Sequence, residues 1–131
     1  MTRLLLDTTF LIDAERSDSL DEIIEDDDDI AVAAITIAEL RVGALLADRR
    51  RAAARSAFVD DVADSIPILD YDVEVAEAHA VLLAAMKTQG RPRGAHDLII
   101  AATARAFART IVSADQRAFI DLPGVAIRSR G

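Results

Sequence analysis

Residues 3–7 of this 131-residue chain read Arg-Leu-Leu-Leu-Asp, a short apolar run that ends directly at a carboxylate. Four more short apolar runs follow along the chain. None shows the alternation of polar and apolar residues typical of a strand with one face in solvent. The runs therefore predict buried strands, and their ranges are Arg3–Leu6, Ile30–Ala33, Ile66–Leu69, Thr110–Val112 and Val125–Ile127.

Helical patterns lie between these runs. The long pattern that begins at Asp72 has apolar residues at helical spacing and ends at Gly90, a residue typical of a helix C-cap. Two pairs, Ser19 with Glu22 and Thr36 with Glu39, match the capping box that begins many helices. We expect a short acidic helix near Ser19 and further helices over Thr36–Ala47, Asp48–Ala63, Asp72–Gln89 and Gly94–Ala108.

The alternation of strands and helices predicts the fold class. Strands buried on both faces belong to a parallel sheet that helices cover, so we expect an α/β protein: a three-layer α/β/α sandwich with a mostly parallel sheet. The length predicts one domain over residues 1–131. No run reaches the roughly 18 apolar residues of a membrane span, and no signal-peptide core is present. We therefore expect a cytoplasmic protein.

Composition narrows the possible chemistry. The formal charge of −8 argues against a protein that coats nucleic acid by charge alone. With no cysteine and two histidines, the chain excludes disulfide scaffolds, thiol nucleophiles and thiolate metal sites, so any metal would be a hard cation held by oxygen. The acidic run Asp26–Asp29 predicts a solvated segment, or contact with a basic partner. Arg49–Arg51 fits either an RNA contact or a solvated helix face.

Four carboxylates follow strands or begin helices. Asp7 follows the first apolar run, and Asp115 comes shortly after Thr110–Val112. Glu39 and Asp97 lie near the starts of two expected helices. Ligands of an open parallel sheet bind beyond the carboxyl ends of its strands, so we expect these four side chains to meet at one edge.

Each carboxylate also has a structural interpretation. Asp7 could cap the next helix, and Glu39 could be the capping-box partner of Thr36. Asp97 could face a helix dipole, and Asp115 could form an Asx turn. Four anions in one place repel each other unless a cation joins them, and oxygen ligands suit Mg²⁺ or Mn²⁺. The sequence therefore favours metal-assisted hydrolysis of phosphodiesters.

These carboxylates lie in four blocks whose order and apolar context resemble the PIN domain family. More narrowly, they resemble the VapC toxins of bacterial and archaeal toxin–antitoxin operons. Together the blocks cover nearly the whole chain. They are Asp7–Ile12, Ile35–Leu40 with Gly43, Asp97–Ala104, and Val112–Asp115 with Phe119.

The resemblance implies a Mg²⁺- or Mn²⁺-dependent endoribonuclease that inhibits translation when its VapB antitoxin is lost. It also implies a homodimer bound to that antitoxin. Thr9 matches a small polar residue that orients the first carboxylate, Ser113 matches a hydroxyl of the last block, and Ala118 stands where the family often has Asp. The residues implied to hold the metal and to carry catalysis are Asp7, Glu39, Asp97 and Asp115.

Other residues near these blocks have weaker roles. Arg91 and Arg93, in the loop before Asp97, are candidates for contacts with RNA phosphates. His96 is expected to point about 100° away from Asp97 on a helix.

Two rival functions differ in how well they fit. A phosphorelay receiver needs an acidic pair after the first strand and a lysine at the last one. Here Asp7 is followed by Thr8, and the only lysine, Lys87, lies inside an expected helix. A PIN-like module that binds RNA or protein without cutting stays open as the alternative.

Overall fold

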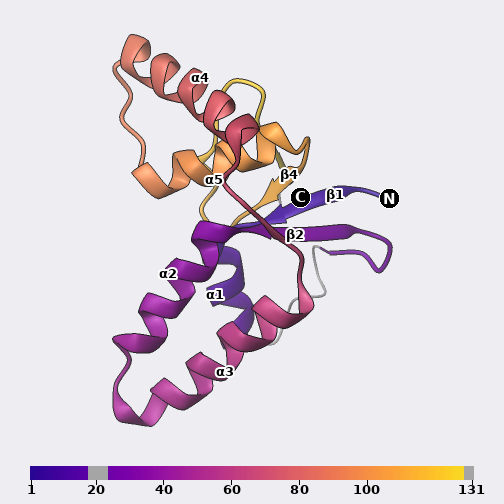
Figure 1. The fold of residues 1–131 in the computed structure, drawn as a ribbon, viewed down its shortest axis with the longest axis vertical. Helices are drawn as coiled ribbons and strands as arrows, with labels where there is room; N and C mark the ends of the chain where they lie inside the picture. Colours follow the sequence, from indigo (N-terminus) through magenta and orange to yellow (C-terminus); the bar gives the residue numbers. More distant parts are fainter. Residues whose placement is uncertain (18–23, 129–131) are drawn as a thin grey trace.

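The computed structural model describes residues 1–17 and 24–128, and this part of the chain contains one parallel sheet (Figure 1). Its strand order is β3-β2-β1-β4-β5, and every neighbouring pair is parallel. The predicted parallel sheet is therefore confirmed. The strands are β1 (Arg3–Leu6), β2 (Asp29–Ala33), β3 (Ile68–Leu69), β4 (Thr110–Val112) and β5 (Ala126–Arg128).

Helices cover both faces of the sheet, as the predicted three-layer sandwich requires. Figure 1 shows α4 and α5 on one side and α1, α2 and α3 on the other. The side chains of Asp48 and Asp72 cap α3 and α4, and Gly90 ends α4 with φ 63°. The elements are α1 (Thr8–Ser17), α2 (Ala34–Leu45), α3 (Arg49–Ser65), α4 (Val73–Gln89), α5 (Ala95–Ala106) and the short 3-10 helix η2 (Gln116–Ala118).

Two apolar layers form the core because successive strand residues point to opposite faces. Leu4 and Leu6 pack in the layer that α1, α2 and α3 cover. Leu5 packs in the layer of α4 and α5, together with the fully buried Phe119. Both layers bury the carboxyl ends of β1 and β4, and the candidate site lies at these ends.

Two elements, β3 and α2, start two residues away from the positions expected from the sequence. The strand expected from Ile66 begins only at Ile68, because Pro67 has no N–H to donate; its carbonyl accepts the N–H of Val32 at 3.0 Å. The capping box at Thr36 is wrong: α2 begins at Ala34, and Thr36 is fully buried within its first turn. The expected acidic helix near Ser19 lies outside the described residues.

The acidic run is only partly solvated, which corrects the sequence interpretation. Asp28 accepts hydrogen bonds from the Arg128 guanidinium, the shorter at 2.7 Å, and only 2% of its side chain is exposed. This bond holds the pKa of Asp28 below its usual value. Asp29 accepts from Arg109 at 3.1 Å. Residues distant in sequence thus neutralise two of the four aspartates.

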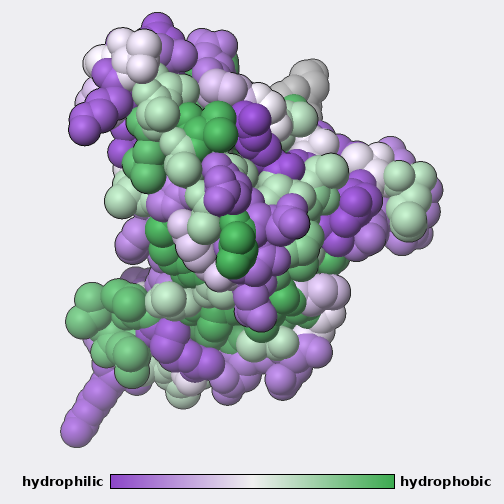
Figure 2. Space-filling model, turned by 45° about the horizontal axis from the view of Figure 1, so that its top comes forward, coloured by the Kyte–Doolittle hydropathy of each residue, from purple (hydrophilic) through white to green (hydrophobic). Residues whose placement is uncertain are grey.

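The surface carries an apolar patch where α2 runs into α3 (Figure 2). Its residues Val42, Leu45 and Leu46 are 52%, 76% and 81% exposed. Exposed apolar groups that lie together commonly mark contact surfaces for another chain. In the described part of the chain, no helix is long and apolar enough to cross a membrane.

Candidate metal-binding site

The four predicted carboxylates interact at one edge of the sheet. Asp7 follows β1 directly, Asp115 follows β4, Glu39 is the sixth residue of α2 and Asp97 the third of α5. The pKa of Asp97 is raised, first by burial and then by the negative charges of the other three. The other three carboxylates therefore lie close enough to disfavour the charged form of Asp97.

Asp7 is the most tightly held of the four. It is 2% exposed, and its Oδ1 accepts the backbone N–H of Thr8 at 2.7 Å. Its Oδ2 accepts two hydroxyls, from Thr9 at 2.6 Å and from Ser113 at 2.7 Å. Because all three partners donate, both carboxyl oxygens of Asp7 act as acceptors, and the network fixes the orientation of the side chain.

The two hydroxyls are themselves oriented by the segment after β4. Thr9 Oγ1 accepts the N–H of Ala114 at 3.2 Å, and Ser113 Oγ accepts the N–H of Asp115 at 2.9 Å. Each oxygen that receives a backbone proton is left to donate its own proton to Asp7. The network thus couples the end of β1 to the loop that carries Asp115.

Glu39 is held by residues that sequence reasoning did not select. Its Oε1 accepts the hydroxyl of Thr8 at 2.7 Å, and its Oε2 lies 3.3 Å from His96 Nδ1. Thr8 Oγ1 also lies 3.2 Å from Thr36 Oγ1. Glu39 therefore contacts α1 and α5 rather than the start of its own helix, and His96, although beside Asp97 in sequence, reaches Glu39. The sequence signal that could have identified Thr8 is its position as a polar residue directly after Asp7.

Asp97 lies against the N-cap of its own helix. A Cβ built on Gly94 would stand 2.7 Å from Asp97 Oδ2, closer than real contacts allow. The carboxylate thus occupies space that only glycine leaves open. It lies in the first turn of α5, where the helix dipole favours negative charge.

A family model for the PIN domain matches residues 4–125. The chain belongs to the PIN domain family. Its fold is similar to that of VapBC-5 from Mycobacterium tuberculosis, a member of the VapBC family of toxin-antitoxin systems. The identity is 32% and the TM-score 0.81, covering 98% of this chain and 100% of that chain.

Two further VapBC structures share the fold at lower identity. DNA-bound VapBC from Salmonella typhimurium is 24% identical with a TM-score of 0.87, covering 100% of both chains. VapBC2 from Rickettsia felis, bound to a promoter DNA fragment, is 21% identical with a TM-score of 0.86, covering 96% of this chain and 97% of that one. No curated protein sequence matches the chain.

The donor set of this PIN domain suits a hard cation. All four candidate ligands are carboxylates, the oxygen donors that Mg²⁺ and Mn²⁺ take. Within residues 1–17 and 24–128, no arginine or lysine forms an ion pair with Asp7, Asp97 or Asp115. In the same described part, no three acidic or histidine side chains stand close enough to share an ion. Side-chain rotation would be needed to bring three of them onto one ion.

Arg93 has structural partners within the protein, and its expected contact with an RNA phosphate stays a prediction. Its guanidinium donates to three backbone carbonyls at and just after η2, at distances of 3.2, 3.0 and 2.7 Å. These bonds tie the loop before α5 to the segment after Asp115, and the acceptors are Arg117, Ala118 and Ile120. Arg91 is 61% exposed, and its phosphate contact stays a prediction.

Gly94→Ala is expected to weaken metal binding with little effect on the fold. The new methyl group would push the Asp97 carboxylate aside, whereas the backbone of Gly94, at φ −58°, accepts alanine without strain. We expect the Mg²⁺ affinity to fall about tenfold, which is the typical loss when a metal ligand is no longer held in its orientation. Calorimetric titration with Mg²⁺ measures it. Gly43→Ala is the control, because a Cβ added at that position would have no atom within 4 Å. Equal Mg²⁺ affinities for the two variants would contradict the prediction.

Proposed function

We propose that this PIN domain is a VapC-type toxin: a Mg²⁺- or Mn²⁺-dependent endoribonuclease that hydrolyses RNA phosphodiesters in the cytoplasm and thereby inhibits translation. The observation that carries the proposal is the close approach of four carboxylates at Asp97, whose pKa is raised first by burial and then by the charges of the other three. If the four carboxylates served only to stabilise the fold, the protein would be more stable with them farther apart, because they repel each other. The binding of a cation explains better why they lie close together.

In this proposal Asp7, Glu39, Asp97 and Asp115 hold the cation and carry catalysis. When bound, the cation lowers the pKa of a water and stabilises charge on the phosphodiester oxygens. Thr9 and Ser113 orient Asp7 through their two hydroxyl donors.

The proposed partners are a VapB-type antitoxin and a second copy of the chain. Similarity to VapBC-5 at 32% identity over nearly the whole chain supports a toxin–antitoxin pairing. The apolar patch of Val42, Leu45 and Leu46 supports contact with another polypeptide.

A metal titration with an RNA cleavage assay tests the proposal. We expect cleavage to require Mg²⁺ or Mn²⁺, to stop in excess chelator and to return when metal is restored. The same titration should raise the melting temperature, because a ligand bound only by the native state stabilises it by mass action. Cleavage that continues unchanged in chelator would contradict the proposal. RNA binding without cleavage at any metal concentration would favour the non-cleaving module.

A further inference from the structure

A groove between α1 and α3 is lined mainly by arginines. Its volume is about 460 Å³. The residues that line it are Glu15, Arg16, Arg50, Arg51, Ala54 and Arg55. In a protein whose formal charge is −8, this concentration of guanidinium groups beside a single carboxylate makes a local positive surface.

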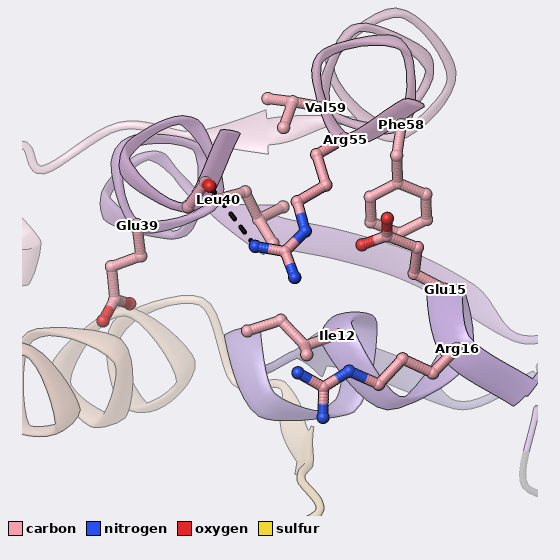
Figure 3. Close-up of a pocket in the computed structure, with 9 residues that line it drawn as sticks. Ile12, Glu15, Arg16, Glu39, Leu40, Arg55, Phe58 and Val59 are labelled. Atoms are coloured by element: carbon pink, nitrogen blue, oxygen red, sulfur yellow. Dashed lines mark hydrogen bonds between the residues drawn. The ribbon is translucent and has the colours of Figure 1, made fainter. Parts of the chain in front are cut away.

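The arginine groove continues into a pocket that reaches the carboxylate site. This pocket, of about 110 Å³, shares Glu15, Arg16 and Arg55 with the groove and has Glu39 in its wall. Figure 3 shows Arg55 entering it from α3 and Arg16 from α1, on opposite sides, with Glu39 at its α2 end. Glu39 thus links the carboxylate site to a pocket that borders the arginine groove.

In the described part of the chain, the arginines of the groove have no acidic ion-pair partner. Over the residues that the structure describes, none of Arg16, Arg50, Arg51 and Arg55 forms an ion pair, and Arg55 donates only a long bond of 3.4 Å to the carbonyl of Gly43. By contrast, Arg41 and Arg109 are paired with aspartates at 2.7 and 3.1 Å. The groove thus keeps its positive charge for a ligand.

We propose that the arginine groove binds the phosphates of the RNA strand next to the bond that is cut. The inference rests on the proposed function. The four carboxylates repel a polyanion, so affinity for RNA has to come from cations beside them, and guanidinium forks match phosphate oxygens. The continuity with Glu39 favours RNA over an acidic protein segment. The inference also assigns an RNA contact to two of the three arginines at the start of α3. Arg50 and Arg51 line the groove, whereas Arg49 does not.

Salt-dependent RNA binding tests the inference. Wild type, Arg50→Gln, Arg51→Gln and the matched control Arg49→Gln would be titrated into labelled single-stranded RNA in chelator, with fluorescence anisotropy as the readout. We expect the two groove variants to bind more weakly and to reduce the slope of log K against log salt by about 0.7 per lost phosphate contact. Arg49→Gln should keep the wild-type slope, and Arg51→Lys should keep most of it. In the cleavage assay, the groove variants should raise KM for RNA more than they lower kcat.

The outcomes separate the groove from the proposed function. If both groove variants match Arg49→Gln in slope and affinity while wild type cuts RNA, the groove inference is overturned and the nuclease proposal stands. If they keep RNA affinity but lose affinity for a polyglutamate peptide, the groove binds an acidic protein segment and the inference is again overturned. Wild type that shows the groove-dependent slope but never cuts RNA would support the groove and contradict the nuclease. Melting temperatures confirm that each variant is folded.

Discussion

Asp97→Asn is expected to abolish RNA cleavage, leave the fold intact and raise the melting temperature of the metal-free protein. Asn removes one charge from a group of four that repel each other, so the apo fold gains stability. It also removes an anionic ligand. Loss of residues that only orient ligands costs about 10- to 100-fold in affinity or activity, so we expect cleavage to fall by more than about 100-fold. Cleavage rates and metal-free melting curves measure both effects.

The pH dependence of the melting temperature tests whether Asp97→Asn stabilises the metal-free protein. Because the pKa of Asp97 is higher in the folded protein than its ordinary 3.8, the native state binds this proton more tightly than the unfolded state. This group's contribution to stability therefore falls as pH rises from 3.8 through the folded pKa. The melting-temperature difference between Asp97→Asn and wild type should grow over that interval.

The control for this variant is Asp61→Asn, the same change at an exposed position of α3. It should alter neither cleavage nor the pH trend. If Asp97→Asn unfolds the protein, the residue is structural first, and its assignment as a metal ligand loses support.

Glu39→Gln is expected to retain the fold and to need far more Mg²⁺ for cleavage. The amide oxygen of Gln can still accept the Thr8 hydroxyl that Glu39 accepts at 2.7 Å. It cannot supply the negative charge that a divalent cation requires. Melting curves without metal and cleavage rates across a Mg²⁺ titration measure the two effects. If Glu39→Gln cleaves RNA at the wild-type rate at every Mg²⁺ concentration, Glu39 is not a metal ligand and the site consists of the three aspartates.

Glu39→Ala is the matched comparison for the hydrogen bond. It removes the acceptor of the Thr8 hydroxyl, and Thr8 is only 7% exposed. The Thr8 hydroxyl is then left with only its longer contact to Thr36, at 3.2 Å. Loss of a hydrogen bond to a charged group costs about 1.5–3 kcal/mol of unfolding free energy. Ala should therefore lower the metal-free melting temperature, whereas Gln should not; equal losses would show that the Thr8 bond carries no stability.

Local patterns in the sequence were sufficient to predict the strands and helices and the fold class. Apolar runs without alternation predicted the parallel strands, and β1 (Arg3–Leu6) and β4 (Thr110–Val112) have the expected bounds. The N-caps at Asp48 and Asp72 and the C-cap at Gly90 also lie where the pattern placed helix ends. Such features depend on residues a few positions apart, so the sequence alone determines them.

The approach of the four carboxylates was also predictable. The carboxyl ends of parallel strands meet at one edge of a sheet, so a carboxylate after a strand needs only the fold class to be placed there. Asp7 and Asp115 follow from this rule without knowledge of side-chain contacts. Strand order then brought β1 between β2 and β4, which completed the group with Glu39 and Asp97.

Only the tertiary structure decided which partner each polar side chain has. Thr36 had the spacing of a cap for Glu39, yet Thr8 on another helix is the donor. The sequence made Arg93 a candidate for a phosphate contact, and only the structure shows that its guanidinium also donates to three backbone carbonyls. A hydrogen bond depends on direction and on distances of about 3 Å, and residues far apart in sequence reach these distances only after the strands and helices have packed. The sequence therefore determined where the charges lie along the fold, and packing determined what each charge contacts.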